Sequence, residues 1–519
     1  MSSSSQFAEY IPLAEKACDF LTASPDPFHA VHNCVQKLKA AGFVGLDSTE
    51  PLTGKLQPGG KYYYIVEHST LVAFAVGPKC SIDTTNGSTI ISSFGFHMIG
   101  GHTDSPNLKI KPKSKRTASG CILLGVECYG GGLWHTWFDR DLSVSGRVLV
   151  QQRQQQPNND NDNTSKPLLF AKTEQRLVNL KDPIARISTL CIHLQSPEER
   201  QGFTVNKENH TSPIIATESI RSKENNAAKE KLEQDAESQL NGNTSKWREA
   251  QEPLLLDAIA EKLGVDKEEI VDFELNLYDT QPASLGGITK EFLYSARLDN
   301  LATVFCAMES LVQYTTGTDS TFSESADVSL AVVFDHEEVG SVSAQGAGSP
   351  VMSSAVERIA AALNGGSVNP DVYNACIRKS FILSIDQAHA IHPNYASKHE
   401  AQHAPKLNSG IVIKTNNNQR YATTGITGFV VRELGRIAAV PVQEFVVRND
   451  CPCGSTIGPT VSANTGIRVV DAGMPQLSMH SCREVMGIVD LTHGVNIFKA
   501  FYNHFRDLDD SLSKQIDSQ

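Results

Sequence analysis

The chain has 519 residues, of which 40% are hydrophobic and 20% charged, so it is long enough for more than one globular domain. Its 58 acidic residues outnumber its 46 basic ones, which gives a net charge of −12, and no block rich in Lys and Arg interrupts this balance. Nucleic acid and anionic membranes both reward basic surfaces, so we expect neither as a partner.

The N-terminal residues, "MSSSSQFAEYIPLAEKACDFL", lack the basic start and continuous apolar stretch of a secretory signal. The eleven cysteines are an odd number without a framework of spacings, which fits a reducing compartment. We therefore expect a soluble cytoplasmic protein. Cys451 and Cys453 in "CPC" could suggest a zinc site, but no second pair stands at zinc-finger spacing, and we interpret them as structural thiols.

In chain order, residues 7–41 have helical spacing of apolar residues, and "YYYIVEHSTLVAFAV" predicts two strands of a hairpin. After "GGHTDSP" the runs become short and β-like: "GCILLGVECYGG", "GRVLVQ", "KPLLFAK" and "ISTLCIHLQ". Two polar stretches interrupt this region, near 151–165 and 206–252. The first is of low complexity, and the second is charged, rich in Asn and poor in aromatic residues, so both are predicted to be mobile surface loops.

From Pro253, "LLLDAIAEKLG" predicts a helix and "IVDFELNLYD" a strand buried on one face. The "ASLGG" that follows is a candidate domain boundary. Beyond it, helical segments such as "RLDNLATVFCAMESLVQY" alternate with apolar strands such as "SLAVVF" and "SFILSI". This alternation predicts an α/β fold with a mixed, largely parallel sheet flanked by helices.

Residues that can bind a metal follow several of these strands. They are His102, Asp104, Glu337, Glu338, Asp386 and His480, and Asp299 lies near the start of a predicted helix. Each alone has an ordinary explanation as a solvated strand end, a cap or a turn residue. Ligand sites of open α/β sheets lie outside the carboxyl ends of the strands, so we expect these residues to converge. Two histidines with several carboxylates suit zinc or a related divalent ion, and a shared carboxylate can bridge two ions.

The adjacent residues Glu337 and Glu338 are predicted to have different roles. Neighbouring residues at a bend point in different directions, so Glu338 can bind a metal while Glu337 faces the water molecule. A carboxylate beside an activated water can take its proton as general base and pass it to a leaving amine.

Six motifs make the chain resemble the aspartyl aminopeptidases, a family of dinuclear zinc exopeptidases, over nearly its whole length: "GGHTDSPNLKIKP", "SARLDNLATVF", "DHEEVGSVSAQGAGSP", "SIDQAHAIHPNY", "RNDCPCGSTIGP" and "MHSCREVMG". The resemblance implies two Zn²⁺ per subunit. By it, one zinc is held by His102 and Asp386, the other by Glu338 and His480, and both by Asp299. It also makes Glu337 the general base and lets Asp104 orient His102.

The family further implies a discontinuous catalytic domain, residues 1–104 and 286–519, with an inserted β-rich dimerisation domain at 105–285. It implies a tetrahedral dodecamer in which His193 reaches a neighbouring subunit's site. Substrate contacts map onto His389, Lys414 and Tyr421. Without the resemblance, His193 would be interpreted as a core histidine on a strand and Lys414 as a solvated strand end. One departure is His336, which stands where many relatives have Asn.

Together these observations predict a metalloaminopeptidase that removes an N-terminal Asp or Glu from peptides by attack of a zinc-bridged hydroxide. One alternative is a related dinuclear aminopeptidase that prefers neutral residues. Another is a non-catalytic, self-assembling shell or cargo protein, although the intact set of candidate ligands argues against it.

Overall fold

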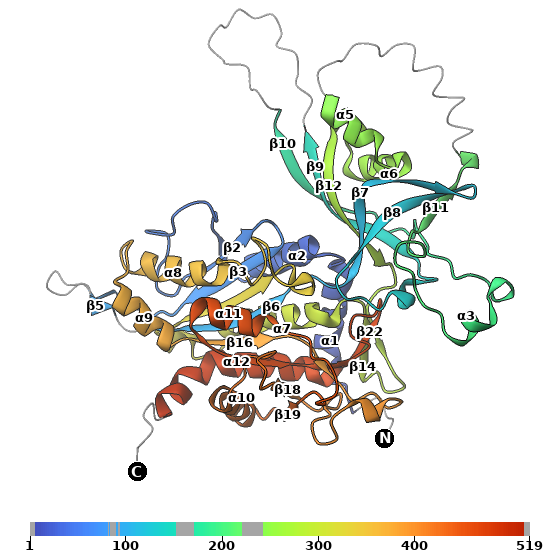
Figure 1. Ribbon diagram of the computed structural model, residues 1–519. Coiled ribbons are helices and arrows are strands. Elements are labelled where there is room, and N and C mark those ends of the chain that lie inside the picture. The colour runs from blue at the N-terminus through green and yellow to red at the C-terminus, as the bar shows by residue number, and fades with distance from the viewer. Residues whose placement is uncertain are drawn as a thin grey trace, which may run out of the picture. The chain divides into compact units, whose positions relative to one another are not determined.

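The computed structural model describes residues 6–80, 82–83, 90–91, 94–151, 171–220 and 242–512 (Figure 1). The chain divides into two compact units. Unit 1 comprises Met1–Ser105 and Pro282–Gln519, and unit 2 comprises Pro106–Gln281. Within the described ranges, the helices are too short or too polar to cross a membrane.

The centre of unit 1 is a mixed nine-stranded sheet. Its strands, in spatial order, are β1 (Val44–Gly45), β2 (Lys61–Val66), β3 (Thr70–Val76), β15 (Val328–Phe334), β6 (Phe96–His102), β16 (Phe381–Ile385), β20 (Arg468–Gly473), β18 (Ile411–Lys414) and β19 (Val442–Phe445). The four strands β15, β6, β16 and β20 run parallel to one another. The predicted hairpin is confirmed, because β2 and β3 pair antiparallel.

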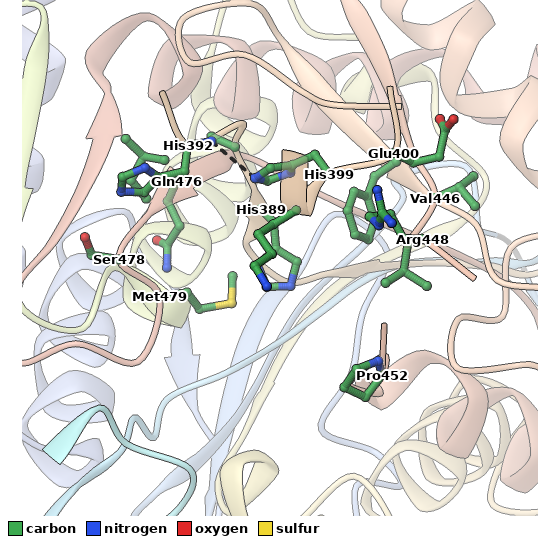
Figure 2. A pocket seen from close by; sticks show the side chains of 15 residues that line it. His389, His392, His399, Glu400, Val446, Arg448, Pro452, Gln476, Ser478 and Met479 are labelled. Atoms are coloured by element: carbon green, nitrogen blue, oxygen red, sulfur yellow. Dashed lines mark hydrogen bonds between the residues drawn. The ribbon is translucent and has the colours of Figure 1, made fainter. Parts of the chain in front are cut away.

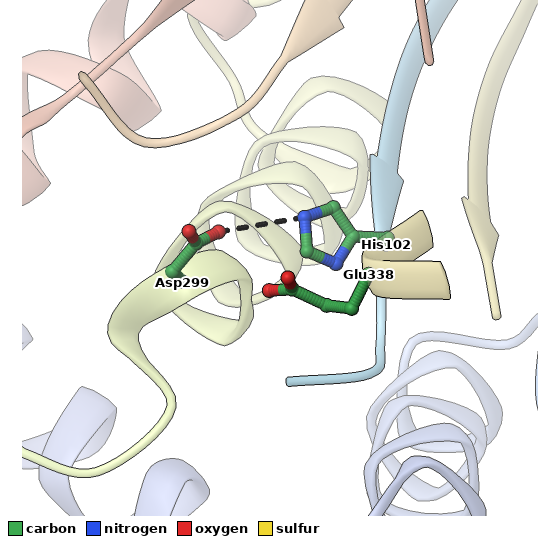
Figure 3. Close-up of side chains that lie close together, drawn as sticks. All are labelled: His102, Asp299 and Glu338. Carbon is green, nitrogen blue, oxygen red and sulfur yellow. Dashed lines mark ion pairs between the residues drawn. The ribbon is translucent and has the colours of Figure 1, made fainter. Parts of the chain in front are cut away.

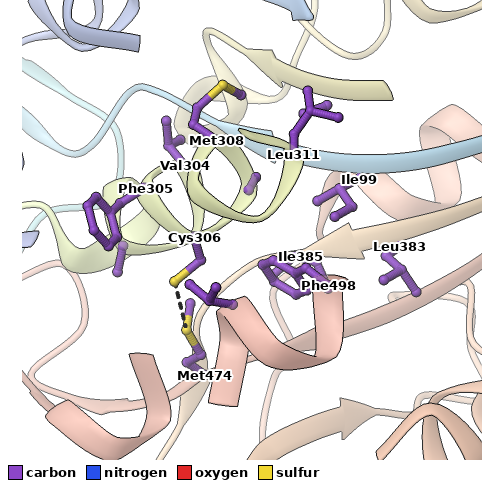
Figure 4. Packing of buried hydrophobic residues seen from close by; sticks show 14 of the residues in the cluster. Ile99, Val304, Phe305, Cys306, Met308, Leu311, Leu383, Ile385, Met474 and Phe498 are labelled. Carbon is purple, nitrogen blue, oxygen red and sulfur yellow. Dashed lines mark hydrogen bonds between the residues drawn. The ribbon is translucent and has the colours of Figure 1, made fainter. Parts of the chain in front are cut away.

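Helices cover both faces of this sheet. One core contains residues of α1 (Ile11–Ala23), α2 (Pro27–Ala40), α7 (Leu298–Thr316), α10 (Gly425–Ala438) and α12 (Ile488–Ser511). The other contains residues of α8 (Val351–Leu363), α9 (Pro370–Arg378) and α11 (Ile457–Thr465). Met98 and Ile99 on β6 point into opposite cores, which explains why the central strands are continuous apolar runs. Figure 4 shows α7 packing Val304 and Leu311 in the same cluster as Ile99 and Phe498.

Unit 1 also holds a smaller five-stranded sheet. Its order is β13 (Ser284–Gly286), β14 (Phe292–Ser295), β22 (Glu484–Gly487), β21 (Pro475–Leu477) and β17 (Ala388–His389). Two short strands, β4 (Ile82–Asp83) and β5 (Ile90–Ile91), pair separately. The "ASLGG" segment thus contributes β13 to unit 1.

Unit 2 is built on an antiparallel six-stranded sheet. Its order is β10 (Thr173–Asn179), β9 (Leu142–Gln151), β12 (Ile270–Asp279), β7 (Asn107–Ala118), β8 (Cys121–Tyr129) and β11 (Ile214–Thr217). The α-helices with bounds among the described residues of this unit are α3 (Pro197–Gln201), α5 (Gly242–Glu249) and α6 (Pro253–Leu263). The predicted helix after Pro253 is confirmed as α6, with Gly264 in the left-handed conformation that ends it.

Several expectations for unit 2 are wrong. The run "ISTLCIHLQ" forms no named strand and contains a short 3₁₀ helix, η4 (Ile192–Leu194), because it lies at the surface without a pairing strand. The polar stretch 206–252 is not wholly loop, since β11 pairs with β8 and α5 packs Trp247 on Phe273. Residues 152–170 and 221–241, including the predicted loop near 151–165 and most of "KPLLFAK", lie outside the described residues.

Candidate metal centre

Three neighbouring parallel strands deliver candidate ligands to one edge of the large sheet. His102 is the last residue of β6, Asp386 follows β16, and Glu337 and Glu338 come shortly after β15. Because β6 lies between β15 and β16 in the sheet, their carboxyl ends meet at a single edge. This is where ligand sites of α/β sheets lie.

The turn after β15 is held in place by Asp104. One carboxylate oxygen of Asp104 accepts a hydrogen bond from the backbone N–H of Glu337, and the other accepts one from that of Glu338, both at 3.1 Å. His336, just before them, has φ of 62°, a left-handed conformation that Asn and His tolerate better than most residues. The two glutamates then begin a 3₁₀ helix, η7 (Glu337–Val339).

Two further candidate ligands come from outside the large sheet. Asp299 stands in the first turn of α7, as predicted, and its peptide bond to Asn300 is cis. His480 follows β21 of the five-stranded sheet and has φ of 64°. The side chains from both sheets meet at the same place.

Asp299 lies between the two histidines. His102 Nε2 is 3.4 Å from Asp299 Oδ1 and 3.4 Å from Asp386 Oδ1. His480 Nε2 is 3.5 Å from Asp299 Oδ2 and 3.3 Å from Glu338 Oε2. Figure 3 shows Asp299 facing His102, with Glu338 beside them, and one ligand atom from each of these three residues lies within 4.8 Å of the others.

These side chains fit a divalent cation. Asp299, Glu338 and Asp386 each have a buried carboxylate oxygen that accepts no hydrogen bond, which is costly unless a cation faces it. His102 Nδ1 lies 3.0 Å from the backbone oxygen of Asp104, which can only accept, so Nδ1 carries a proton and Nε2 faces the carboxylates. Metal-binding histidines are oriented in this way.

The titration of the cluster follows from burial and crowding. Burial disfavours the charged form of His102, but the carboxylates of Asp104, Asp299 and Asp386 outweigh this effect and raise its pKa well above 6.5. Burial, together with neighbouring carboxylates, raises the pKa of Glu337 to about 8 and that of Glu338 well above its usual value. A cluster that so strongly resists further negative charge is suited to a cation.

Neither glutamate is the solvated strand end that one might assume from composition. The side chains of Glu337 and Glu338 are 14% and 4% exposed. Glu337 Oε2 lies 3.9 Å from His102 Nε2, whereas Glu338 contacts His480. The Glu337 carboxylate therefore lies on the His102 side of the cluster, and the Glu338 carboxylate lies on the His480 side.

The three predicted substrate-binding residues of unit 1 gather around Phe445. Lys414 is buried, so its interpretation as a solvated strand end is wrong; its Nζ lies 3.3 Å from Asp386 Oδ2 and 5.6 Å from the centre of the Tyr421 ring. Burial, and then a hydrogen bond with Cys453, raise the pKa of Tyr421. The rings of Tyr421 and His389 both pack edge-on against Phe445.

A cavity of about 270 Å³ adjoins this group. Figure 2 shows His389 at its centre, with Met479 on one side and Arg448 on the other. Arg448 is already engaged, because Nε and Nη2 donate to the carboxylate of Asp450 at 2.8 and 2.7 Å.

His193 belongs to the other unit of the chain, where it stands on η4 of unit 2. It is exposed, so its interpretation as a core histidine on a strand is wrong. Cys451 and Cys453 are free thiols, half-buried, and outside the candidate metal cluster of the described residues.

Sequence reasoning missed Glu484, which is buried beneath the cluster. Its Oε2 accepts a hydrogen bond from the backbone N–H of Asp299 at 3.0 Å, and its Oε1 accepts one from that of His480 at 2.8 Å. Burial, and then the Asp299 carboxylate, raise its pKa to about 8. Glu484 lies inside the motif "MHSCREVMG", but no periodicity or spacing marks a glutamate that acts on backbone groups.

Comparison with known proteins gives one consistent family. The model of the family described as "Aminopeptidase I zinc metalloprotease (M18)" matches residues 20–502. A "Probable aspartyl aminopeptidase" of Ricinus communis is 43% identical over 511 residues, covering 97% of this chain and 98% of the relative. An "Aspartyl aminopeptidase" of Dictyostelium discoideum is 40% identical over 96% of this chain and 98% of the relative.

Solved structures agree. One described as "Cryo-EM structure of the Ape4 and Nbr1 complex" is similar with a TM-score of 0.85 and 38% identity, covering 99% of this chain and 89% of that one. Another, "Structure of S. cerevesiae mApe1 dodecamer", has a TM-score of 0.77 and 29% identity, covering 98% of this chain and 100% of that one.

Proposed function

Because the chain belongs to the M18 family of aminopeptidase I zinc metalloproteases, we propose that it removes an N-terminal Asp or Glu from peptides, using two zinc ions held at the candidate metal centre. The observation that carries this proposal is the convergence of two histidines with three carboxylates, each of which has one buried oxygen that accepts no hydrogen bond.

The residues divide into two ligand sets. His102 and Asp386 would hold one ion, Glu338 and His480 would hold the other, and Asp299 would contribute to both. This division is supported by Asp299 itself, whose Oδ1 faces His102 while Oδ2 faces His480. When bound, such a pair of divalent ions supplies Lewis-acid activation of a water molecule and of the substrate carbonyl.

Glu337 moves the proton. It takes a proton from the water that attacks the first peptide carbonyl, and then gives this proton to the leaving amine. Its support is geometric: Glu337 is adjacent to the ligand Glu338, lies 3.9 Å from His102, and has its backbone fixed by Asp104. Asp104 would thus orient the ligand His102 and also position the general base Glu337.

Lys414 recognises the acidic side chain of the substrate, with Tyr421 and His389 beside it. A pocket that selects Asp or Glu must offer a positive charge to a desolvated carboxylate, and Lys414 is a buried cation next to the ligand Asp386. Arg448 in the neighbouring cavity suits this role less well, because its side chain is 39% exposed and donates two hydrogen bonds to Asp450, whereas Lys414 is buried.

The test compares Asp-, Glu-, Ala- and Leu-nitroanilides. The protein should cleave the acidic substrates best, lose hydrolysis in chelator and regain it with Zn²⁺, Mn²⁺ or Co²⁺. Lys414→Met should lower kcat/KM for Asp far more than for Ala, because an unpaired buried carboxylate costs about 2 to 5 kcal/mol. Lys398→Met, at an exposed lysine of the cavity wall, is the matched control.

A wild-type preference for Ala or Leu would establish the neutral aminopeptidase instead. Complete absence of hydrolysis with metal bound would favour the shell or cargo protein. An equal loss of Asp and Ala cleavage in Lys414→Met would assign this lysine to the fold or the chemistry.

We place the enzyme in the cytoplasm as a homo-oligomer, with unit 2 as the dimerisation domain of a tetrahedral dodecamer. All eleven cysteines are free, which suits a reducing compartment. Exposed apolar side chains cluster along one segment of unit 2 and favour association: Leu190, Ile192, Leu194 and Phe203. A relative at 29% identity is described as a dodecamer. Cell fractionation and light scattering test location and assembly.

A further inference from the structure

The five-stranded sheet of unit 1 places one buried carboxylate between two segments that carry candidate ligands. Glu484 is the first residue of β22, the strand that lies between β14 and β21. β14 runs into the segment that bears Asp299, and β21 runs into the segment that bears His480. The start of the middle strand therefore reaches both segments at once.

Each oxygen of Glu484 is committed to one of these segments. Oε2 accepts from the backbone N–H of Asp299 at 3.0 Å. Oε1 accepts from the backbone N–H of His480 at 2.8 Å and from Gln476 Nε2 at 3.3 Å. The residue is 2% exposed, so these bonds are shielded from water and no solvent can replace them.

We propose that Glu484 is a positioning residue, which fixes the distance between Asp299 and His480 and so preforms the metal site they share. This inference rests on the proposed metal site. Asp299 and His480 come from segments far apart in the sequence, yet His480 Nε2 lies 3.5 Å from Asp299 Oδ2. Because one carboxylate accepts hydrogen bonds from both backbone segments, Asp299 and His480 are already oriented before the ions bind. Metal binding then does not have to bring the two segments together.

A glutamine cannot accept hydrogen bonds from both backbone N–H groups in this way. Glu484→Gln keeps one oxygen but places an NH₂ group opposite one of the two backbone N–H groups, so one segment loses its partner. We expect the affinity of chelator-stripped protein for Zn²⁺, measured by competition with a chromophoric chelator, to fall roughly 10- to 100-fold. Glu484→Asp, which keeps both oxygens on a shorter side chain, should lose less.

The matched control is Asp490→Asn. Asp490 is also buried in unit 1 and accepts two backbone N–H groups, those of Asn408 and Gly410, but neither belongs to the metal cluster. This variant should lower the Tm of the metal-free protein, as Glu484→Gln should, yet keep the wild-type Zn²⁺ affinity.

Wild-type Zn²⁺ affinity in Glu484→Gln, with a fall in Tm alone, would overturn the proposal and leave Glu484 a structural residue. If Glu484→Gln does not fold, wild-type affinity in Glu484→Asp with a lowered Tm would overturn it equally. Because no substrate is present, the result stands even if the peptidase activity proposed above is not found.

Discussion

At the scale of single residues, two buried carboxylates position the candidate site by accepting hydrogen bonds from backbone N–H groups. Asp104 holds the N–H groups of Glu337 and Glu338, and Glu484 holds those of Asp299 and His480. Four residues of the candidate site are thus held by two carboxylates that are not proposed ligands. Candidate ligands could be inferred from the sequence because they follow apolar strands, whereas carboxylates that bind backbone groups carry no residue-type signature.

The two adjacent glutamates should separate in their effects. Glu337→Gln should keep both metals, because Glu338 is the proposed ligand, and should lower kcat by about 10² or more as the general base is lost. Glu338→Gln should lower the metal content itself. Zinc analysis of the purified variants, alongside kcat, distinguishes these outcomes. Metal loss in Glu337→Gln with full occupancy in Glu338→Gln would reverse the two roles.

At the scale of elements, the sequence predicts the parallel strands well because burial on both faces makes them continuous apolar runs. The run "ISTLCIHLQ" misleads for a physical reason, since only Ile187 at its start is buried, whereas Leu190, Ile192 and Leu194 are exposed. Apolar composition therefore indicates a strand only where a sheet is available to bury it. In contrast, β11 within a polar stretch forms because β8 offers it an edge.

A buried charge network joins α12 to the large sheet. His97 on β6 lies 3.5 Å from Asp327, which is also bound by Arg506 of α12, and the rings of Phe501 and Phe505 cover it. Burial lowers the pKa of His97 to about 4, because it outweighs the opposing attraction of Asp327, and the charge of Arg506 acts in the same direction as burial. His97 is therefore neutral in the folded protein at neutral pH.

This network predicts acid-sensitive stability. Between pH 6.5 and about 4 the unfolded chain binds a proton at residue 97 that the folded chain does not. The contribution of His97 to stability is therefore full above pH 6.5 and falls by up to about 1.4 kcal/mol per pH unit below it. Urea unfolding at pH 7.5, 6.0 and 4.5 measures the slope. His97→Gln should make the slope shallower, whereas His504→Gln, at a histidine of α12, should not. Equal slopes in wild type and His97→Gln would refute the assignment.

At the scale of the whole molecule, unit 1 supplies every proposed metal ligand, and unit 2 supplies one proposed site residue, His193. That residue stands on η4 between Ile192 and Leu194, which are 62% and 71% exposed. Large apolar side chains at such exposure commonly mark a surface that another chain covers. The sequence alone could not reveal this, because exposure depends on which neighbours the fold provides.

We expect His193 to act on the site of a neighbouring subunit, where it steadies the tetrahedral intermediate of peptide hydrolysis. His193→Ala and Glu337→Gln should each be nearly inactive as uniform oligomers. After dissociation and mixed reassembly, a His193→Ala subunit keeps an intact Glu337 and receives His193 from its Glu337→Gln neighbour, so part of the activity should return. The control is a mixture of Glu337→Gln and Asp386→Asn subunits. Every subunit in it has His193 but lacks one residue of its own site in unit 1, so this mixture should stay inactive. Activity that stays absent in mixed oligomers verified by native mass spectrometry would place the action of His193 within its own subunit.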